Sequence, residues 1–253
     1  MTDFLFNTFS AAPILERYRA APGDEIGSRK MESPESSAAL VANSFGFFME
    51  RPADLPPLPD WRGKWLPLHV LPEEEMRFPW RGGRHPWLDV LVETDAHFIG
   101  IESKRFEPFR TRAMGSFSSA FWRPGVWGPG MRPYEWMRDG LKLQPGLFRH
   151  LDAFQLVKHA LGLRTQARAR HKKPILVYLY AEPAKWPAGS GGPIAPEEHA
   201  RHAEEARWFG RLVQGAEVEF RCSSYRALLG EFSKSKMPAI VRHAQMIEEA
   251  FGV

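Results

Sequence analysis

The pattern of apolar and polar residues is clearest near the middle of the chain, where two short apolar runs lie on either side of a polar turn. The runs cover residues 87–92 and 98–101, and the polar residues 93–97 separate them. Short β-branched runs joined by a compact polar turn are typical of an antiparallel hairpin. A continuous apolar run at residues 174–180 predicts a central strand that is buried on both faces.

The remaining pattern predicts outer strands and helices around this centre. Outer strands are expected at 65–80 and 216–222, and helices at 36–50, 151–162, 197–213 and 238–251, with a further helix from Ser223 or Ser224. The helix that starts at Leu151 continues its apolar stripe to Leu161 and is expected to end near Gly162. Residues 1–20 are expected to form a short amphipathic helix or a docking arm. Polar, proline-rich or basic stretches at 21–36, 51–60 and 164–173 are expected to be loops or connectors.

This order of elements predicts an α/β protein with a mixed central β-sheet flanked by helices. The hydrophobic content of 43% is ample for one core, so a single domain over residues 1–253 is expected, with residues 1–35 as an N-terminal arm. The one cysteine, Cys222, excludes an internal disulfide framework and fits a reducing compartment. No apolar run has the length of a membrane span, and the N-terminus lacks the layout of a signal peptide. A soluble, cytoplasmic protein without a membrane partner is therefore expected.

Residues 110–149 show no sustained periodicity and are far longer than an ordinary connection. Their many tryptophans and phenylalanines argue against disorder, and arginines are interleaved with them. Two interpretations stay open: arginine and aromatic side chains that contact phosphates and bases, or a self-packed surface loop with a small core of its own. Nucleic-acid contacts are predicted here and nearby for Arg105, Arg110, Arg112, Trp122 and Arg123.

Acidic residues occupy unusual positions in the predicted hairpin. Asp89 lies inside the first apolar run, and Glu102 and Lys104 share one face of the second strand while Ser103 points to the other. A buried carboxylate is unfavourable unless it is paired or bound to a metal. We therefore expect Asp89, Glu102 and the backbone carbonyl of Ser103 to bind Mg²⁺ or Mn²⁺. Lys104 would then orient or deprotonate a metal-bound water, which outlines a site for phosphodiester hydrolysis.

Several alternatives stay open at these residues. An acid-x-Lys sequence is also common at exposed strand edges, where it forms a surface ion pair. The acidic run that contains Glu73 and Glu75 is more often a solvated edge, although either residue is a candidate for a third acid at the site. The spacing of His199, His202 and Glu205 on a predicted helix outlines a zinc triad, but no fourth ligand with matching spacing is evident.

The charge is distributed unevenly along the chain, although the formal net charge is only +4. Residues 81–174 carry 17 Lys and Arg against 8 Asp and Glu, whereas residues 1–80 carry 8 against 12 and residues 175–253 carry 9 against 10. The excess positive charge therefore falls on the segment that holds the candidate site, as a polyanion-binding surface requires. The alternative is an ordinary arginine-rich surface.

Asp89 followed by Glu102-Ser103-Lys104 on a strand hairpin resembles the pattern of the PD-(D/E)XK nuclease superfamily, although Leu88 stands where the proline of that name would be. The longer string IESKRFEPF resembles an uncharacterised bacterial branch of the superfamily and adds Glu107. The string QLVKHALGL at 155–163 extends the resemblance.

The resemblance implies a restriction-endonuclease-like core with residues 110–149 as a long Arg/Trp-rich insertion. It implies metal ligation by Asp89 and Glu102, a catalytic Lys104, and water or phosphate contacts from Gln155 and Lys158. The alternative for Gln155 and Lys158 is a helix flank that is merely solvated, and His159 itself is expected to be a satisfied neighbour rather than a ligand. The expected function is a metal-dependent nuclease acting on DNA or RNA, with DNA favoured and a homodimer left open. The alternative is a catalytically silent module with the same fold that binds nucleic acid or a protein.

Overall fold

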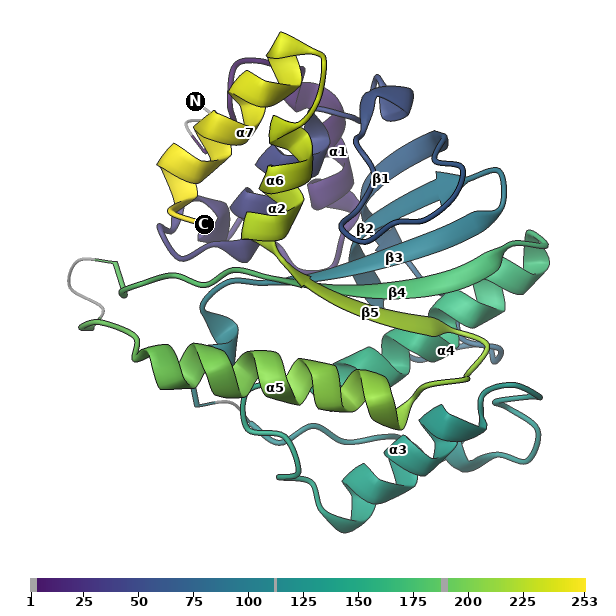
Figure 1. Ribbon diagram of the computed structural model, residues 1–253. Helices are drawn as coiled ribbons and strands as arrows, with labels where there is room; N and C mark the ends of the chain where they lie inside the picture. Colours follow the sequence, from purple (N-terminus) through teal and green to yellow (C-terminus); the bar gives the residue numbers. More distant parts are fainter. Residues whose placement is uncertain (1–3, 112, 188–190) are drawn as a thin grey trace.

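A five-stranded mixed sheet forms the centre of the protein in the computed structural model, which describes residues 4–111, 113–187 and 191–253 (Figure 1). The strands are β1 (Pro67–Glu75), β2 (Trp87–Thr94), β3 (His97–Lys104), β4 (Lys173–Tyr180) and β5 (Glu219–Ser224), and they lie in this order across the sheet. Strand β2 is antiparallel to both of its neighbours, β1 and β3, whereas β3, β4 and β5 run parallel. The predicted mixed sheet flanked by helices is confirmed.

The predicted hairpin is present, with Val90 paired to Ile101 and Val92 to Ile99. The first strand is shorter than the predicted span of 65–80 because it leaves the ladder after Glu75. Beyond that point the backbone amide of Phe78 donates to the His85 side chain at 3.1 Å, and the segment turns back toward β2.

Helices cover both faces of the sheet (Figure 1). One face is covered by α1 (Ala11–Ala20), α2 (Ser37–Gly46), α6 (Tyr225–Ser233) and α7 (Pro238–Phe251), and the other by α3 (Arg132–Leu143), α4 (Ala153–Ala169) and α5 (Pro196–Leu212). Ser36 caps α2 by accepting the amide of Ala39 at 3.0 Å, as a helix start with serine predicts. Asn43 holds the N-terminal arm, because its side chain accepts the amide of Phe6 at 2.8 Å and donates to the carbonyl of Phe4 at 2.7 Å.

Helix α4 is longer than expected, and the prediction that it ends near Gly162 is wrong. The helix continues to Ala169, so most of the basic stretch predicted as a solvated loop is helical. A Cβ atom at Gly162 would lie 2.8 Å from the backbone carbonyl of Met76. Glycine is therefore needed at this position because the chain between β1 and β2 passes close to the helix, and not because the helix stops there.

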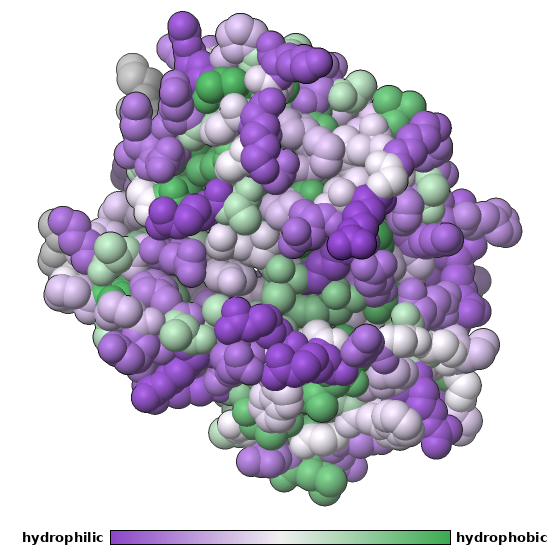
Figure 2. Space-filling model, in the orientation of Figure 1, coloured by the Kyte–Doolittle hydropathy of each residue, from purple (hydrophilic) through white to green (hydrophobic). Residues whose placement is uncertain are grey.

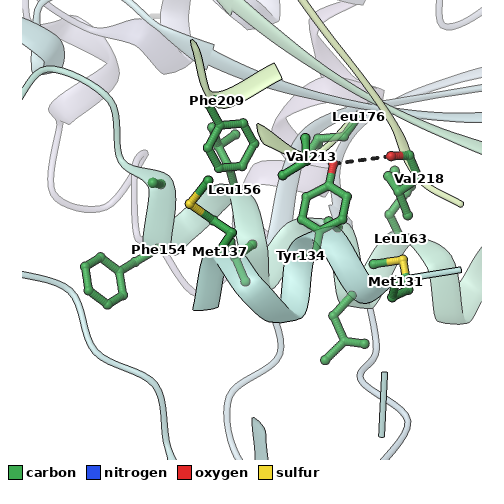
Figure 3. Packing of buried hydrophobic residues seen from close by; sticks show 14 of the residues in the cluster. Met131, Tyr134, Met137, Phe154, Leu156, Leu163, Leu176, Phe209, Val213 and Val218 are labelled. Atoms are coloured by element: carbon green, nitrogen blue, oxygen red, sulfur yellow. Dashed lines mark hydrogen bonds between the residues drawn. The ribbon is translucent and has the colours of Figure 1, made fainter. Parts of the chain in front are cut away.

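Residues 110–149 are more regular than expected, because they contain α3. Tyr134, Met137, Arg138 and Leu141 form the buried stripe of this helix. The polar Arg138 interrupts the apolar pattern of the stripe, which is why the sequence did not predict this helix. The guanidinium group of Arg138 donates to the carbonyl of Phe121. In Figure 3 the hydroxyl of Tyr134 points to the carbonyl of Val218, which accepts its hydrogen bond at 3.4 Å. Apart from the exposed Trp136, the aromatic residues of this segment therefore belong to the main core and do not form a separate one.

The surface of the molecule is largely hydrophilic on the side seen in Figure 2, and apolar side chains gather toward its lower end, around α3. Helix α3 exposes Trp136 and Leu143, with 62% and 87% of their surface accessible. Among the described residues, no helix combines the length and the apolar character that crossing a bilayer requires.

Candidate active site

The candidate site lies where strand β2 separates from β3. The two strands are paired only from Val90 to Glu93, whereas β3 continues for three residues past Ile101. Beyond the last pair, the carboxylate of Asp89 accepts the backbone amide of Ser103 at 2.6 Å. The Asp89 side chain thus takes the place of a ladder acceptor and is held directly beside the Glu102-Ser103-Lys104 sequence.

Glu102 and Lys104 share one face of β3, as predicted, and Ser103 faces the other way. Glu102 is 1% exposed, and its Oε1 forms an ion pair with the ammonium group of Lys104. Its Oε2 lies 3.2 Å from Nδ1 of His159 on α4, without a hydrogen bond. The hydroxyl of Ser103 instead bonds to the hydroxyl of Tyr225 at 2.7 Å, on the side covered by α6. The site therefore contains a buried carboxylate oxygen whose hydrogen-bonding capacity is unused.

Further acids line a cavity together with Asp89. A cavity of about 290 Å³, here named the carboxylate cavity, is lined by Glu73, Asp89 and Glu107, and by residues of the N-terminal arm. The Glu107 carboxylate accepts the hydroxyl of Ser37 at 2.5 Å and the amide of Arg105 at 2.8 Å, so its position is fixed. Glu107, which the IESKRFEPF string adds to the pattern, thus lines the same cavity as Asp89.

Glu73 reaches this cavity through a kink in β1. Its backbone has a φ of 50°, which places a non-glycine residue in the left-handed region. Arg17 of α1 stabilises the kink by donating to the carbonyls of Pro72 and Glu73, the latter at 2.7 Å, and by an ion pair with Glu74. Of the two candidates for a third acid, Glu73 therefore lies at the site. Glu75 lies elsewhere and forms an ion pair with Arg77, with an N–O distance of 3.1 Å.

Burial and mutual repulsion perturb the acids of the site. Burial, together with the charge of Glu102, raises the pKa of Asp89 well above its usual value. Burial also raises the pKa of Glu102, although Lys104 opposes this effect. For Glu73, burial and the charges of Asp89 and Glu102 raise the pKa to about 8. The site holds more negative charge than its own cation neutralises.

The two basic groups at the site respond in opposite directions. Burial disfavours the ammonium form of Lys104, but the carboxylates of Glu102 and Asp89 outweigh it and raise the pKa, so Lys104 is protonated. Burial, with the charge of Lys104 next, lowers the pKa of His159 to about 3, so its imidazole is neutral near pH 7. His159 is the site residue that the sequence analysis set aside. Its position four residues after Gln155, on the same face of α4, was the available signal.

The donor groups at this site fit a hard divalent cation. Glu102 offers a buried carboxylate oxygen without a hydrogen-bond partner, and Asp89 offers a second carboxylate beside it. Mg²⁺ commonly binds one or two protein carboxylates and keeps several waters. Within residues 4–111, 113–187 and 191–253, no three His, Cys, Asp or Glu side chains converge as a metal cluster. Asp89 and Glu102 are the residues that would hold such an ion, with water as its remaining ligands.

The predicted supporting residues, Gln155 and Lys158, lie on α4 within one turn of His159. Gln155 is half-buried one turn before His159, and its amide is capped by Asp152 at 2.9 Å. Lys158 is half-buried, and its ammonium lies 5.7 Å from the centre of the Phe117 ring. Burial lowers the pKa of Lys158.

The residues predicted to contact nucleic acid have different surroundings. Arg105 is 6% exposed and donates to the carbonyls of Pro34 and Phe251 at 2.7 and 2.6 Å, so it stabilises the fold and is not presented to a ligand. Arg110 is half exposed and forms an ion pair with Glu35. Arg123 is exposed.

Trp122 is half-buried and donates from Nε1 to Asp139 at 3.3 Å, in a packed position rather than a stacking platform. Arg112 lies outside the described residues.

The three residues considered as a zinc triad are used separately. His202 bonds to the hydroxyl of Tyr178 at 2.8 Å. Glu205 accepts backbone amides of residues 149–151. His199 packs against the ring of Phe109, with ring centres 4.7 Å apart.

Comparison with protein-family models gives no match to this chain, and neither the curated proteins nor the solved structures contain a significant match.

Proposed function

We propose that this protein is a divalent-metal-dependent phosphodiesterase that cleaves nucleic acid, and that its sheet is a restriction-endonuclease-like core of the PD-(D/E)XK superfamily. One observation carries the proposal: Asp89 is held at the point where β2 leaves β3, beside the buried pair of Glu102 and Lys104. Carboxylates on separating strands, with one protonated lysine, are the groups that metal-assisted hydrolysis needs.

In this proposal Asp89 and Glu102 hold Mg²⁺ or Mn²⁺, with the carbonyl of Ser103 as a third candidate donor. The bound ion supplies electrophilic stabilisation of the phosphoryl oxygens and lowers the pKa of a coordinated water. Burial raises the pKa values of Asp89 and Glu102, and neighbouring carboxylates add to this rise; a bound cation would favour their ionised forms. Protonation of these acids and metal binding are therefore competing events.

Lys104 acts as a cation and hydrogen-bond donor in this scheme. Because the neighbouring carboxylates raise its pKa, Lys104 keeps its proton and does not accept one from water. Its ion pair with Glu102 fixes the ammonium group at the site, where it orients the attacking water or stabilises charge on the phosphate. His159, neutral and buried against Glu102, helps to exclude bulk water from that carboxylate.

The experiment is cleavage of supercoiled DNA, single-stranded DNA and RNA in Mg²⁺, in Mn²⁺ and in EDTA. We expect cleavage only with a divalent ion, and a loss of at least about 10³-fold in Glu102→Gln and Lys104→Ala, because each removes a group that acts on the reacting phosphate. Glu75→Gln and Lys64→Ala are matched controls, since both side chains lie on the surface away from the site. Cleavage at the wild-type rate in both site variants would refute the proposed site.

A second candidate is a catalytically silent module of the same fold. The direct ion pair of Lys104 with Glu102, and the absence of three convergent metal ligands among the residues described, favour it. This candidate predicts nucleic-acid binding in EDTA with a steep dependence on salt, and no cleavage with Mg²⁺ or Mn²⁺.

A further inference from the structure

A second cavity adjoins the carboxylate cavity. It encloses about 450 Å³ and lies between the turn at residues 107–109, the loop that follows α3 and the beginning of α4. Arg110 lines both cavities, so the two spaces share one residue of their walls. A group bound in the second cavity would therefore lie next to whatever occupies the carboxylate cavity.

Aromatic and cationic side chains line this second cavity. Phe109, Phe148 and Phe154 are among the lining residues, and we name it the aromatic cavity for these three residues. Arg110, which is ion-paired with Glu35, and Arg149 are the cations of the lining, while Glu198, 3.9 Å from Arg149, is its carboxylate. The combination suits a flat ring system attached to an anion.

The wall of the aromatic cavity is built rigidly. Glu205 on α5 accepts the backbone amides of Arg149, His150 and Leu151 at 2.9, 2.7 and 2.9 Å. Nδ1 of His150 bonds to the carbonyl of Pro108 at 2.9 Å and ties this loop to the turn after β3. The cavity is thus formed before a ligand arrives, which reduces the ordering that binding requires.

We propose that the aromatic cavity binds the base of a nucleotide whose neighbouring phosphate contacts Arg110, and that the substrate is an unpaired strand. Aromatic side chains stack with any base, since every base has a π-face. A base in a duplex is paired and stacked and must leave the helix before it enters such a cavity. The volume of about 450 Å³ has room for one nucleotide. The assignment of the neighbouring phosphate rests on the proposed nuclease function, whereas the base site is tested without cleavage.

The experiment measures binding in EDTA by fluorescence anisotropy, with labelled oligo(dT), oligo(U) and a hairpin duplex as probes. The variant Gly146→Trp fills the aromatic cavity: a Cβ atom at Gly146 meets nothing within 4 Å, and its φ is outside the left-handed region. Gly140→Trp is the matched control, because its Cβ position is equally open but lies on α3, outside the lining. Arg149→Gln tests the cationic wall, with the exposed Arg226→Gln as its control.

We expect Gly146→Trp to weaken binding of both single strands about 10-fold and to leave duplex binding unchanged, while Gly140→Trp binds like the wild type. Arg149→Gln should weaken single-strand binding and lower the slope of log affinity against log salt by about one. Single-strand binding by Gly146→Trp at wild-type strength, or an equal loss for single strands and duplex, would overturn the proposal. If these effects are found but no divalent ion supports cleavage, the base site stands and the nuclease function fails. If cleavage is found without these effects, the nuclease function stands and the base site fails.

Discussion

Two glutamates lie at opposite ends of the parallel strands, and their surroundings differ in one respect. Glu102, near the end of β3, has one cation, Lys104, and further carboxylates around it. Glu217, just before β5, lies between Arg164 and Arg168, with Nε–oxygen distances of 2.8 and 2.5 Å. Burial raises the pKa of Glu217, but the hydrogen bonds from the two arginines outweigh it and lower that pKa.

The difference separates a structural charge from one that is available for a ligand. At Glu217 both carboxylate oxygens are used, and its backbone amide also donates to the carbonyl of Gly130 at 2.6 Å, which ties the segment before α3 to the sheet. At Glu102 one buried oxygen lacks a hydrogen-bond partner and the pKa is raised. Groups that are buried, perturbed and incompletely paired are candidates for chemistry, whereas fully paired ones stabilise the fold.

The largest expected effect on stability is at Glu217. Glu217→Ala leaves Arg164, whose side chain is 8% exposed, without its carboxylate, and should lower the free energy of unfolding by about 3 kcal/mol. Denaturant unfolding followed by circular dichroism measures this. Glu204→Ala removes a carboxylate that also pairs with two arginines but is exposed, so its unfolding midpoint should stay at the wild-type value. An equal loss of unfolding free energy in Glu217→Ala and Glu204→Ala would contradict the idea that burial of the ion pair decides its contribution to stability.

A smaller, pH-dependent effect on stability is expected at Glu73, beside the candidate site. The pKa of Glu73 in the folded protein is raised from 4.5 to about 8, so its ionisation destabilises the fold. This destabilisation is absent below pH 4.5 and grows until about pH 8. Glu73→Gln should therefore match the wild type at low pH and exceed its stability by about 2 kcal/mol at pH 9. Urea unfolding of both proteins across this range measures the difference, and Glu75→Gln should show no such trend.

The smallest effect is stabilisation by the ion itself. If Glu102 and Asp89 hold Mg²⁺, a concentration tenfold above the dissociation constant should raise the unfolding free energy by about 1.4 kcal/mol. Glu102→Gln should lose this gain, whereas Glu217→Gln, although less stable, should keep it. Thermal unfolding with Mg²⁺ and with EDTA tests both variants. The same gain in Glu102→Gln as in the wild type would mean that the ion binds elsewhere.

The sequence was most informative where one physical requirement decided the pattern. The apolar run of β4 and the alternating faces of Glu102, Ser103 and Lys104 were predictable because a strand buried on one or both faces has to satisfy a period of two. Helix α7 has the predicted limits, Pro238 to Phe251, because proline marks its start and Gly252, with a φ of 63°, follows its end.

The sequence was less informative where distant segments decide the outcome. The buried stripe of α3 was obscured by Arg138, whose burial depends on the carbonyl of Phe121. Gly162 looked like a helix end because its neighbour, the carbonyl of Met76, is far away in the sequence. The kink that turns Glu73 into the carboxylate cavity depends on Arg17, which lies 56 residues earlier. His159 and Glu102 come together only when α4 packs on β3.

The contacts of Arg17 also decide how the sheet meets other molecules. Strand β1 is an edge strand, and its free carbonyls and amides would accept a strand from a neighbouring copy. Pro67 and Pro72 offer no amide hydrogen, and Arg17 already occupies the carbonyls of Pro72 and Glu73. The residues that shape the acidic site thus also protect this edge from pairing with a strand of another molecule.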